Sequence, residues 1–242
     1  FNWRGWWNFG TGALGDMGCH LIDIPFKALG LKYPTDVECS IGTIFTKMWS
    51  ADYYPEGCPP SSSVSLHFDA TEKNKSPIQM TWSDGGIKPF HPDLLPADVS
   101  IEDNGVIMIG EKGVITCDAY GNDPKLYLKG EPVIKGERVK VSEPEFGHQR
   151  QWVDACKAGF NSEEHKSLTS SFDYSGPLTE TVLMGNIAIR SYNLEEKKEG
   201  SRRSSYVGRT KPLWDGDNMK IKNLEAANQF VTRDYREGWE LT

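Results

Sequence analysis

The stretch Gly10-Thr11-Gly12-Ala13-Leu14-Gly15-Asp16-Met17-Gly18-Cys19-His20-Leu21-Ile22-Asp23 decides how the rest of the chain is interpreted. Its glycines permit positive φ angles and a close approach of the backbone to a neighbour, because glycine has no Cβ. An apolar run over residues 21–31 follows. This pattern predicts a helix that begins near Gly15 and ends near Gly30.

Three side chains in this stretch have the chemistry of a proton-transfer site. Asp16 and His20 are spaced i, i+4 and Asp23 follows three residues later, so a helix places all three on one face. A carboxylate one turn from an imidazole fixes its tautomer and tunes its pKa for acid–base catalysis. Two other interpretations stay open: Asp16 as a helix cap, and His20 as an ordinary residue of an amphipathic helix. A metal site that includes Cys19 would need ligands that no motif supplies.

Composition and charge exclude several classes of protein. The 242 residues suffice for one large domain, and 38% hydrophobic with 25% charged residues is typical of a globular chain. A net charge of −7 disfavours nucleic acid or an anionic membrane surface as partner. No apolar run approaches the roughly 18 residues of a membrane span. The five cysteines are widely spaced without C-x-x-C, which argues against a disulfide framework or a zinc site.

The first nine residues are rich in aromatic side chains. We interpret them either as a segment that anchors the chain to its core or as a wall of the site. In the second case Trp7 stacks on a sugar and Arg4 donates to its hydroxyls or to a carboxylate. Because the chain starts at Phe1 inside this aromatic run, we expect it to be part of a longer protein.

The remaining pattern predicts one α+β domain over residues 1–242, with a large, mainly antiparallel open sheet and helices packed on one face. The predicted strands are 37–48, 63–70, 77–83, 105–109, 113–117, 126–128 and 139–141. Helices over 146–158 and 178–192 join the motif helix on that face, with Pro177 in the first turn of the second. His148, at the start of the first, is assigned to substrate binding.

The stretch resembles the active-site segment of the Gfo/Idh/MocA oxidoreductases, whose second domain carries a pattern close to G-G-G-x-x-x-D-x-G-x-H-x-x-D. The positions that match in type and spacing are Gly10, Gly12, Asp16, Gly18, His20 and Asp23, and Thr11 replaces one glycine. The tail, with W-D-G-D-N-M-K at 214–220 and Y-R-E-G-W at 235–239, resembles an extension found in a bacterial branch of that family. We expect residues 210–242 to fold back on the domain.

The resemblance implies that His20 is the general acid/base at a substrate hydroxyl or carbonyl and that Asp16 orients it and contacts the substrate. Asp23 is assigned to substrate binding. The chain would be the substrate-binding and catalytic half of an enzyme that uses NAD or NADP to oxidise a sugar or cyclitol. The run Gly10–Gly15 fits G-x-G-x-x-G in letters, but no β-branched strand precedes it, so we reject a dinucleotide-binding loop. Only Gly12 is assigned a cofactor contact.

Most of the cofactor site would lie on an additional N-terminal Rossmann domain, so we expect this chain alone to be inactive. Two alternatives remain: an NAD-dependent glycoside hydrolase of the same fold, and a non-catalytic binding or assembly module. In the family the sheet commonly forms the subunit interface, which implies a homo-oligomer. The bacterial resemblance leaves the location open between the cytoplasm and export to the periplasm.

Overall fold

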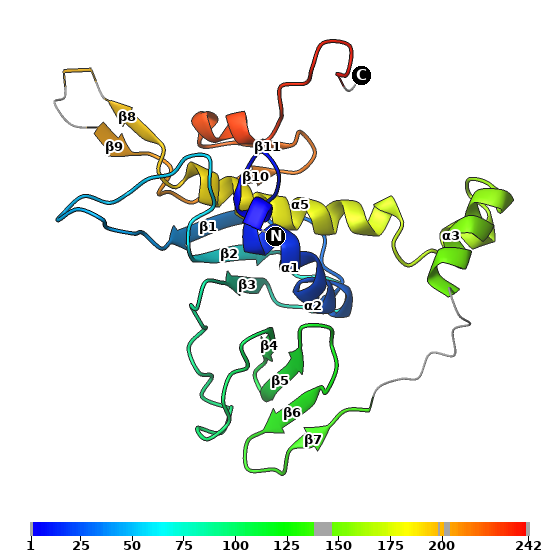
Figure 1. Ribbon diagram of the computed structural model, residues 1–242. Helices are drawn as coiled ribbons and strands as arrows, with labels where there is room; N and C mark the ends of the chain where they lie inside the picture. The colour runs from blue at the N-terminus through cyan, green and yellow to red at the C-terminus, as the bar shows by residue number, and fades with distance from the viewer. Residues whose placement is uncertain (1, 138–146, 198, 201–203, 241–242) are drawn as a thin grey trace.

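The computed structural model describes residues 2–137, 147–197, 199–200 and 204–240. Helices and antiparallel strands together confirm the predicted α+β class (Figure 1). The helices are η1 (Asn2–Gly5), α1 (Gly12–Leu21), α2 (Asp23–Leu29), α3 (Gly147–Ala158), α4 (Glu163–Lys166), α5 (Phe172–Ser191) and η2 (Glu225–Phe230), where η marks a 3-10 helix. Among the described helices, none combines the length and apolar character needed to cross a membrane.

The described strands are divided among separate antiparallel sheets instead of joining one large sheet. One sheet has the order β1-β2-β3, formed by Asp36–Ile41, Ser62–Phe68 and Ile78–Ser83. A second has the order β4-β5-β6-β7, formed by Gly105–Ile109, Gly113–Asp118, Lys125–Leu128 and Ile134–Lys135. Two hairpins complete the set: β8 (Glu195–Lys197) with β9 (Ser204–Tyr206), and β10 (Trp214–Asp215) with β11 (Lys220–Ile221). The predicted strand 139–141 lies outside the described residues.

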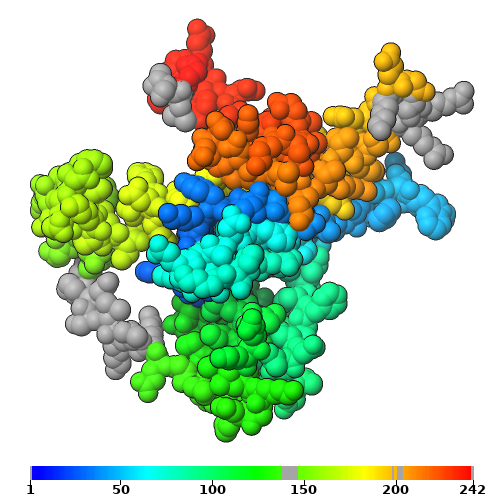
Figure 2. Space-filling model, turned by 180° about the vertical axis from the view of Figure 1, so that it is seen from behind, coloured from blue at the N-terminus to red at the C-terminus, as the bar shows by residue number. Residues whose placement is uncertain are grey.

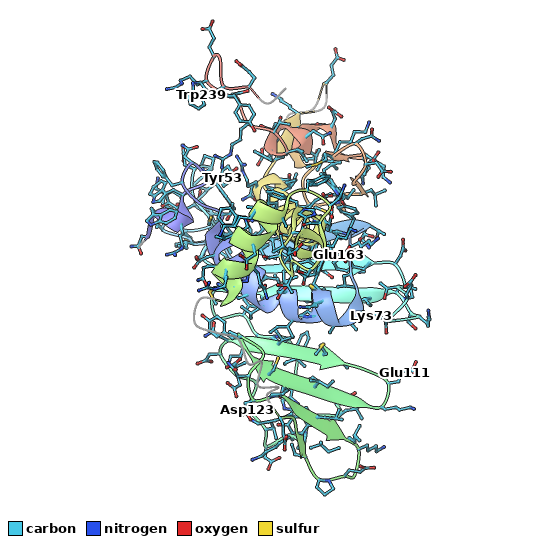
Figure 3. All side chains as sticks on the ribbon, turned by 90° about the vertical axis from the view of Figure 1, so that its right-hand side faces the viewer. Tyr53, Lys73, Glu111, Asp123, Glu163 and Trp239 are labelled. Carbon is cyan, nitrogen blue, oxygen red and sulfur yellow. The ribbon has the colours of Figure 1, made fainter. Side chains whose placement is uncertain are left out.

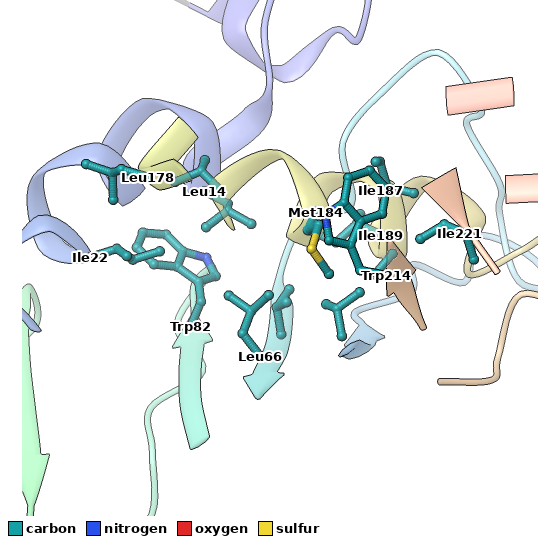
Figure 4. Packing of buried hydrophobic residues seen from close by; sticks show 14 of the residues in the cluster. Leu14, Ile22, Leu66, Trp82, Leu178, Met184, Ile187, Ile189, Trp214 and Ile221 are labelled. Carbon is teal, nitrogen blue, oxygen red and sulfur yellow. The ribbon is translucent and has the colours of Figure 1, made fainter. Parts of the chain in front are cut away.

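The core lies between the three-stranded sheet and α5. Alternate residues of β2, namely Val64, Leu66 and Phe68, are buried, as the sequence pattern predicted. Leu14 of α1 fills the space between this sheet and α5, and it is only 1% exposed (Figure 4). Gly185 permits this close approach, because a Cβ there would lie 2.4 Å from Leu14 Cδ2.

The single helix predicted over the motif is two helices, α1 and α2, that meet at Ile22. Pro25 explains the interruption, because proline has no N–H to donate to the carbonyl of Leu21. The end of α2 agrees with the prediction. Gly30 adopts a left-handed conformation with φ of 65°, which closes the helix.

The helices near residues 146–192 differ from the prediction in two respects. α5 begins at Phe172, so Pro177 lies inside the helix and not in its first turn. α3 does form, but it packs against α4 and lies beyond the end of α5 instead of covering the sheet (Figure 1). Its residues are largely exposed, with Ala155 buried, because its apolar positions are too few to build a contact with the sheet.

The C-terminal extension folds back on the domain, and its 3-10 helix η2 packs against α5. Trp214, Ile221 and Ala227 are buried in the core, and Figure 2 shows the tail in orange on the outer side of the molecule, above the blue N-terminal segment. Val231 still packs against the core, and Arg233 lies beside Arg4 and Asp16. Residues 234–240 are exposed. Trp239 is 67% exposed, and Figure 3 shows it beyond the packed elements.

Candidate functional site

An ion pair between η1 and α1 is the centre of the candidate site. Arg4 Nε lies 2.5 Å from Asp16 Oδ1, and both side chains are about one-third exposed to solvent. The glycine-rich loop makes this contact possible. A Cβ on Gly10 would lie 2.7 Å from the Cα of Arg4, so only glycine lets η1 fold this closely onto the start of α1.

A cavity of about 390 Å³ borders this ion pair, and we name it the Asp16 cavity. Its lining residues are Trp3, Arg4, Asn8, Phe9, Gly10, Thr11, Gly12, Gly15, Asp16 and Arg233. Two guanidinium groups, one carboxylate and two aromatic rings therefore surround one volume. That combination suits a polyhydroxylated ligand, since charged groups hydrogen-bond hydroxyls and rings stack on C–H faces.

Gly12 is buried, and its role in the structure is conformational. Its φ is +66°, and a Cβ there would lie 2.9 Å from Cys58 Sγ. The residue lets α1 start against the loop that carries Cys58. The segment that precedes the glycine-rich run is η1 followed by a turn, not a strand, so the run lacks the strand–loop–helix setting of a dinucleotide-binding loop.

His20 lies in the last turn of α1 and is exposed. Its ring meets the ring of Tyr120 edge-on, with the centroids 5.5 Å apart. Within the described parts of the chain, His20 makes no hydrogen bond, and Asp16 bonds to Arg4 instead. The predicted orientation of His20 by Asp16 is therefore absent from this structure. Helical side chains lean toward the N-terminus, so Asp16 points to η1 and away from His20.

Asp23 has a partner that the sequence did not predict. The hydroxyl of Tyr174, on α5, donates a hydrogen bond to Asp23 Oδ1 at the start of α2. Burial and the neighbouring carboxylate raise the pKa of the Tyr174 hydroxyl, which keeps it protonated as a donor. The bond joins segments 151 residues apart, and no local pattern in the sequence indicates it.

Trp7 and His148, both assigned to substrate binding, lie away from the Asp16 cavity. Trp7 is 8% exposed, belongs to the core and borders a different cavity next to Arg190. His148 is exposed on α3, beyond the end of α5 (Figure 1). The structure thus brings Arg4, Gly12 and Asp16 together, and it places the other candidates elsewhere.

Comparison of the sequence with models of known protein families and with curated proteins finds no match. Within the described ranges, no three His, Cys, Asp or Glu residues are grouped so as to hold a metal ion.

Proposed function

We propose that this chain is the substrate-binding and catalytic part of a Gfo/Idh/MocA-type oxidoreductase that acts on a sugar or cyclitol hydroxyl. One observation carries the proposal. The Arg4–Asp16 ion pair borders a cavity at the start of α1, and the exposed His20 follows one turn later on the same helix. Charged hydrogen-bonding groups and an accessible imidazole are what a polyol substrate and a proton transfer require.

In this proposal Arg4 and Asp16 hold hydroxyl groups of the substrate. His20 takes the proton from the reacting hydroxyl, and returns it in the reverse direction. The described residues form no dinucleotide-binding loop, because η1 precedes the glycines and Gly12 faces Cys58. Hydride acceptance is therefore assigned to NAD or NADP on an additional domain, and this chain supplies substrate binding and proton transfer.

The second sheet supports a proposal about assembly. Ile115 on β5 and Ile134 on β7 are exposed, and the strand register through Leu126 places both on the same face of the sheet. Exposed apolar side chains on a sheet favour contact with another protein surface. We propose that this sheet is the homo-oligomer interface, which agrees with either an enzyme or a binding module.

The test of the enzymatic proposal is His20→Ala, made in a protein that joins this chain to its dinucleotide-binding domain. We expect turnover of a sugar substrate to fall by about two to four orders of magnitude, as loss of a general acid/base does. His165→Ala is the matched control, because it also removes a histidine, but one that lies on the short helix α4 and not on α1. Equal activity of the His20→Ala variant and the parent enzyme would contradict the assignment.

A product assay separates the two enzymatic alternatives. With a glycoside as substrate, a dehydrogenase accumulates NADH or NADPH in step with product. A glycosidase that oxidises and then reduces its substrate releases the aglycone with no net change in cofactor. Release without net reduction would replace the dehydrogenase proposal by the NAD-dependent glycoside hydrolase.

A further inference from the structure

A second cavity of about 390 Å³ lies between the loop over residues 42–60 and the C-terminal turn of α5. We name it the Arg190 cavity. Its lining includes Trp7, Tyr53, Arg190, Asn193, Gln229 and Phe230. Tyr53 is carried by the loop, as Figure 3 shows, whereas Gln229 and Phe230 come from η2. Three distant segments of the chain therefore enclose one volume.

The guanidinium of Arg190 is held between aromatic rings in this cavity. Its Cζ lies 4.4 Å from the ring centroid of Phe230 and 5.5 Å from that of Trp7. Within the described residues, Arg190 forms no ion pair with a carboxylate. Burial and the charge of Arg233 lower the pKa of Arg190, so the surroundings disfavour its positive charge.

The groups around Arg190 do not neutralise it near neutral pH. Burial raises the pKa of the Cys58 thiol to about 11 and also raises the pKa of Tyr53, so both are uncharged. Asp52 on the cavity wall accepts hydrogen bonds from the backbone N–H and the hydroxyl of Thr46, each at 3.0 Å, and among the described residues it forms no ion pair with Arg190. A partly buried guanidinium without a carboxylate partner can bind an anion, because its planar donors match an oxyanion.

We propose that the Arg190 cavity binds a small organic oxyanion, with its carboxylate or phosphate on Arg190 and its body beside Trp7 and Tyr53. The side-chain amides of Asn193 and Gln229 offer further hydrogen bonds to the same ligand. The proposal is independent of the oxidoreductase assignment, because Arg4, Asp16 and His20 do not line this cavity.

The first experiment is titration calorimetry of the chain with glucuronate, glucose 6-phosphate and glucose. We expect at least one of the two anions to bind at least tenfold more tightly than glucose. Binding of glucuronate alone identifies a carboxylate ligand, and binding of glucose 6-phosphate alone identifies a phosphate ligand. Absence of binding by both anions overturns the proposal, and so does binding of glucose that equals that of the anions and is weakened to the same degree by Arg190→Met.

Variants locate the binding in this cavity. Arg190→Met keeps the length and apolar contacts of the side chain and is expected to weaken binding of the anion at least tenfold. Arg236→Met is the control, because Arg236 stacks on Trp239 outside the cavity. Unchanged affinity in Arg190→Met overturns the proposal.

A second variant keeps the test decisive if Arg190→Met does not fold. Asn193→Asp retains the oxygen that accepts a hydrogen bond from Arg209 at 3.2 Å, so the fold should be preserved. The added carboxylate offers Arg190 an internal partner and repels an anion. We expect at least tenfold weaker binding, and retention of full affinity counts against the site.

Discussion

The indole Nε1 of Trp214 donates a hydrogen bond to Oε1 of Glu180 at 2.5 Å, which fastens the C-terminal extension to α5. Trp214 is 5% exposed, and Glu180 is partly buried beside it. Burial raises the pKa of the Glu180 carboxyl, and the hydrogen bond from Trp214 offsets part of that rise. A hydrogen bond between two side chains in apolar surroundings thus holds the tail on α5. If either partner is removed, the other is left partly buried without its hydrogen bond.

Replacing Trp214 by Phe should destabilise the chain by about 1–3 kcal/mol, because it leaves the Glu180 carboxylate without its donor. The pKa of Glu180 then rises further above its usual value, so the deficit should shrink as the pH falls through this raised range toward the ordinary glutamate value of about 4.3. Urea unfolding of both proteins near neutral and acidic pH measures this. Glu180→Gln is the control, since an amide oxygen still accepts the bond, and a deficit independent of pH would contradict the explanation.

The close contact of α1 with α5 leads to a second prediction. A Cβ on Gly185 would lie 2.4 Å from Leu14 Cδ2 and 3.3 Å from Val64 Cγ1, inside a packed core. Gly185→Ala should therefore destabilise by about 1–3 kcal/mol through overpacking. Gly176→Ala on the same helix meets no atom within 4 Å and should be neutral or stabilising by up to about 1 kcal/mol.

A double-mutant cycle tests whether the destabilisation by Gly185→Ala comes from its contact with Leu14. Leu14→Ala removes the clashing methyl groups, so Gly185→Ala should cost less in that background than in the parent chain. Thermal unfolding of the four proteins provides the comparison. Strictly additive free energies would show that the strain comes from another contact.

Local patterns in the sequence predicted the parts of the fold that depend on neighbouring residues. The alternation of Val64, Leu66 and Phe68 fixes β2, and Gly30 closes α2 as expected. The division of the strands into separate sheets was not predicted, because each strand's pattern shows which face is buried but not which strand lies beside it. For the same reason, the sequence did not show which segments of the extension beyond η2 would contact the rest of the chain.

The candidate site was predicted less completely, for a related reason. The spacing of Asp16 and His20 places both on one helix face, but it does not show which distant group competes for the carboxylate. Arg4 does so, because the loop at Gly10 folds η1 back on α1. Tyr174, the partner of Asp23, is 151 residues away and carries no motif that marks it.

If Arg4 binds the substrate but takes no part in the chemical step, replacing it should affect KM and leave kcat nearly unchanged. The side chains of Arg4 and Asp16 are both about one-third exposed, so Arg4→Met should change the free energy of unfolding by less than about 1 kcal/mol. In the complete enzyme the same variant should raise KM at least about tenfold with a small change in kcat, if Arg4 binds substrate equally in the ground and transition states. Steady-state kinetics decide this, and an unchanged KM would remove Arg4 from the site.

A charged cluster at the edge of the three-stranded sheet makes stability depend on pH. His67 Nδ1 lies 2.6 Å from Asp36 Oδ1, Thr35 donates to the same carboxylate at 3.0 Å, and Lys211 lies 3.4 Å away. Burial alone would raise the pKa of Asp36, but these hydrogen bonds and charges lower it below its usual value. Because the folded pKa is below the unfolded one, the contribution to stability is present above about pH 4 and is lost as the pH falls further.

Asp36→Asn should therefore flatten the acid limb of the stability curve. Urea unfolding between about pH 6 and pH 3 should show a steeper loss of stability in the parent chain than in the variant, since the variant has no carboxylate to protonate at this position. Asp98→Asn, at an exposed position in the loop after β3, is the control and should follow the parent chain. Parallel curves for Asp36→Asn and the parent chain would show that the His67–Asp36–Lys211 cluster adds nothing to acid stability.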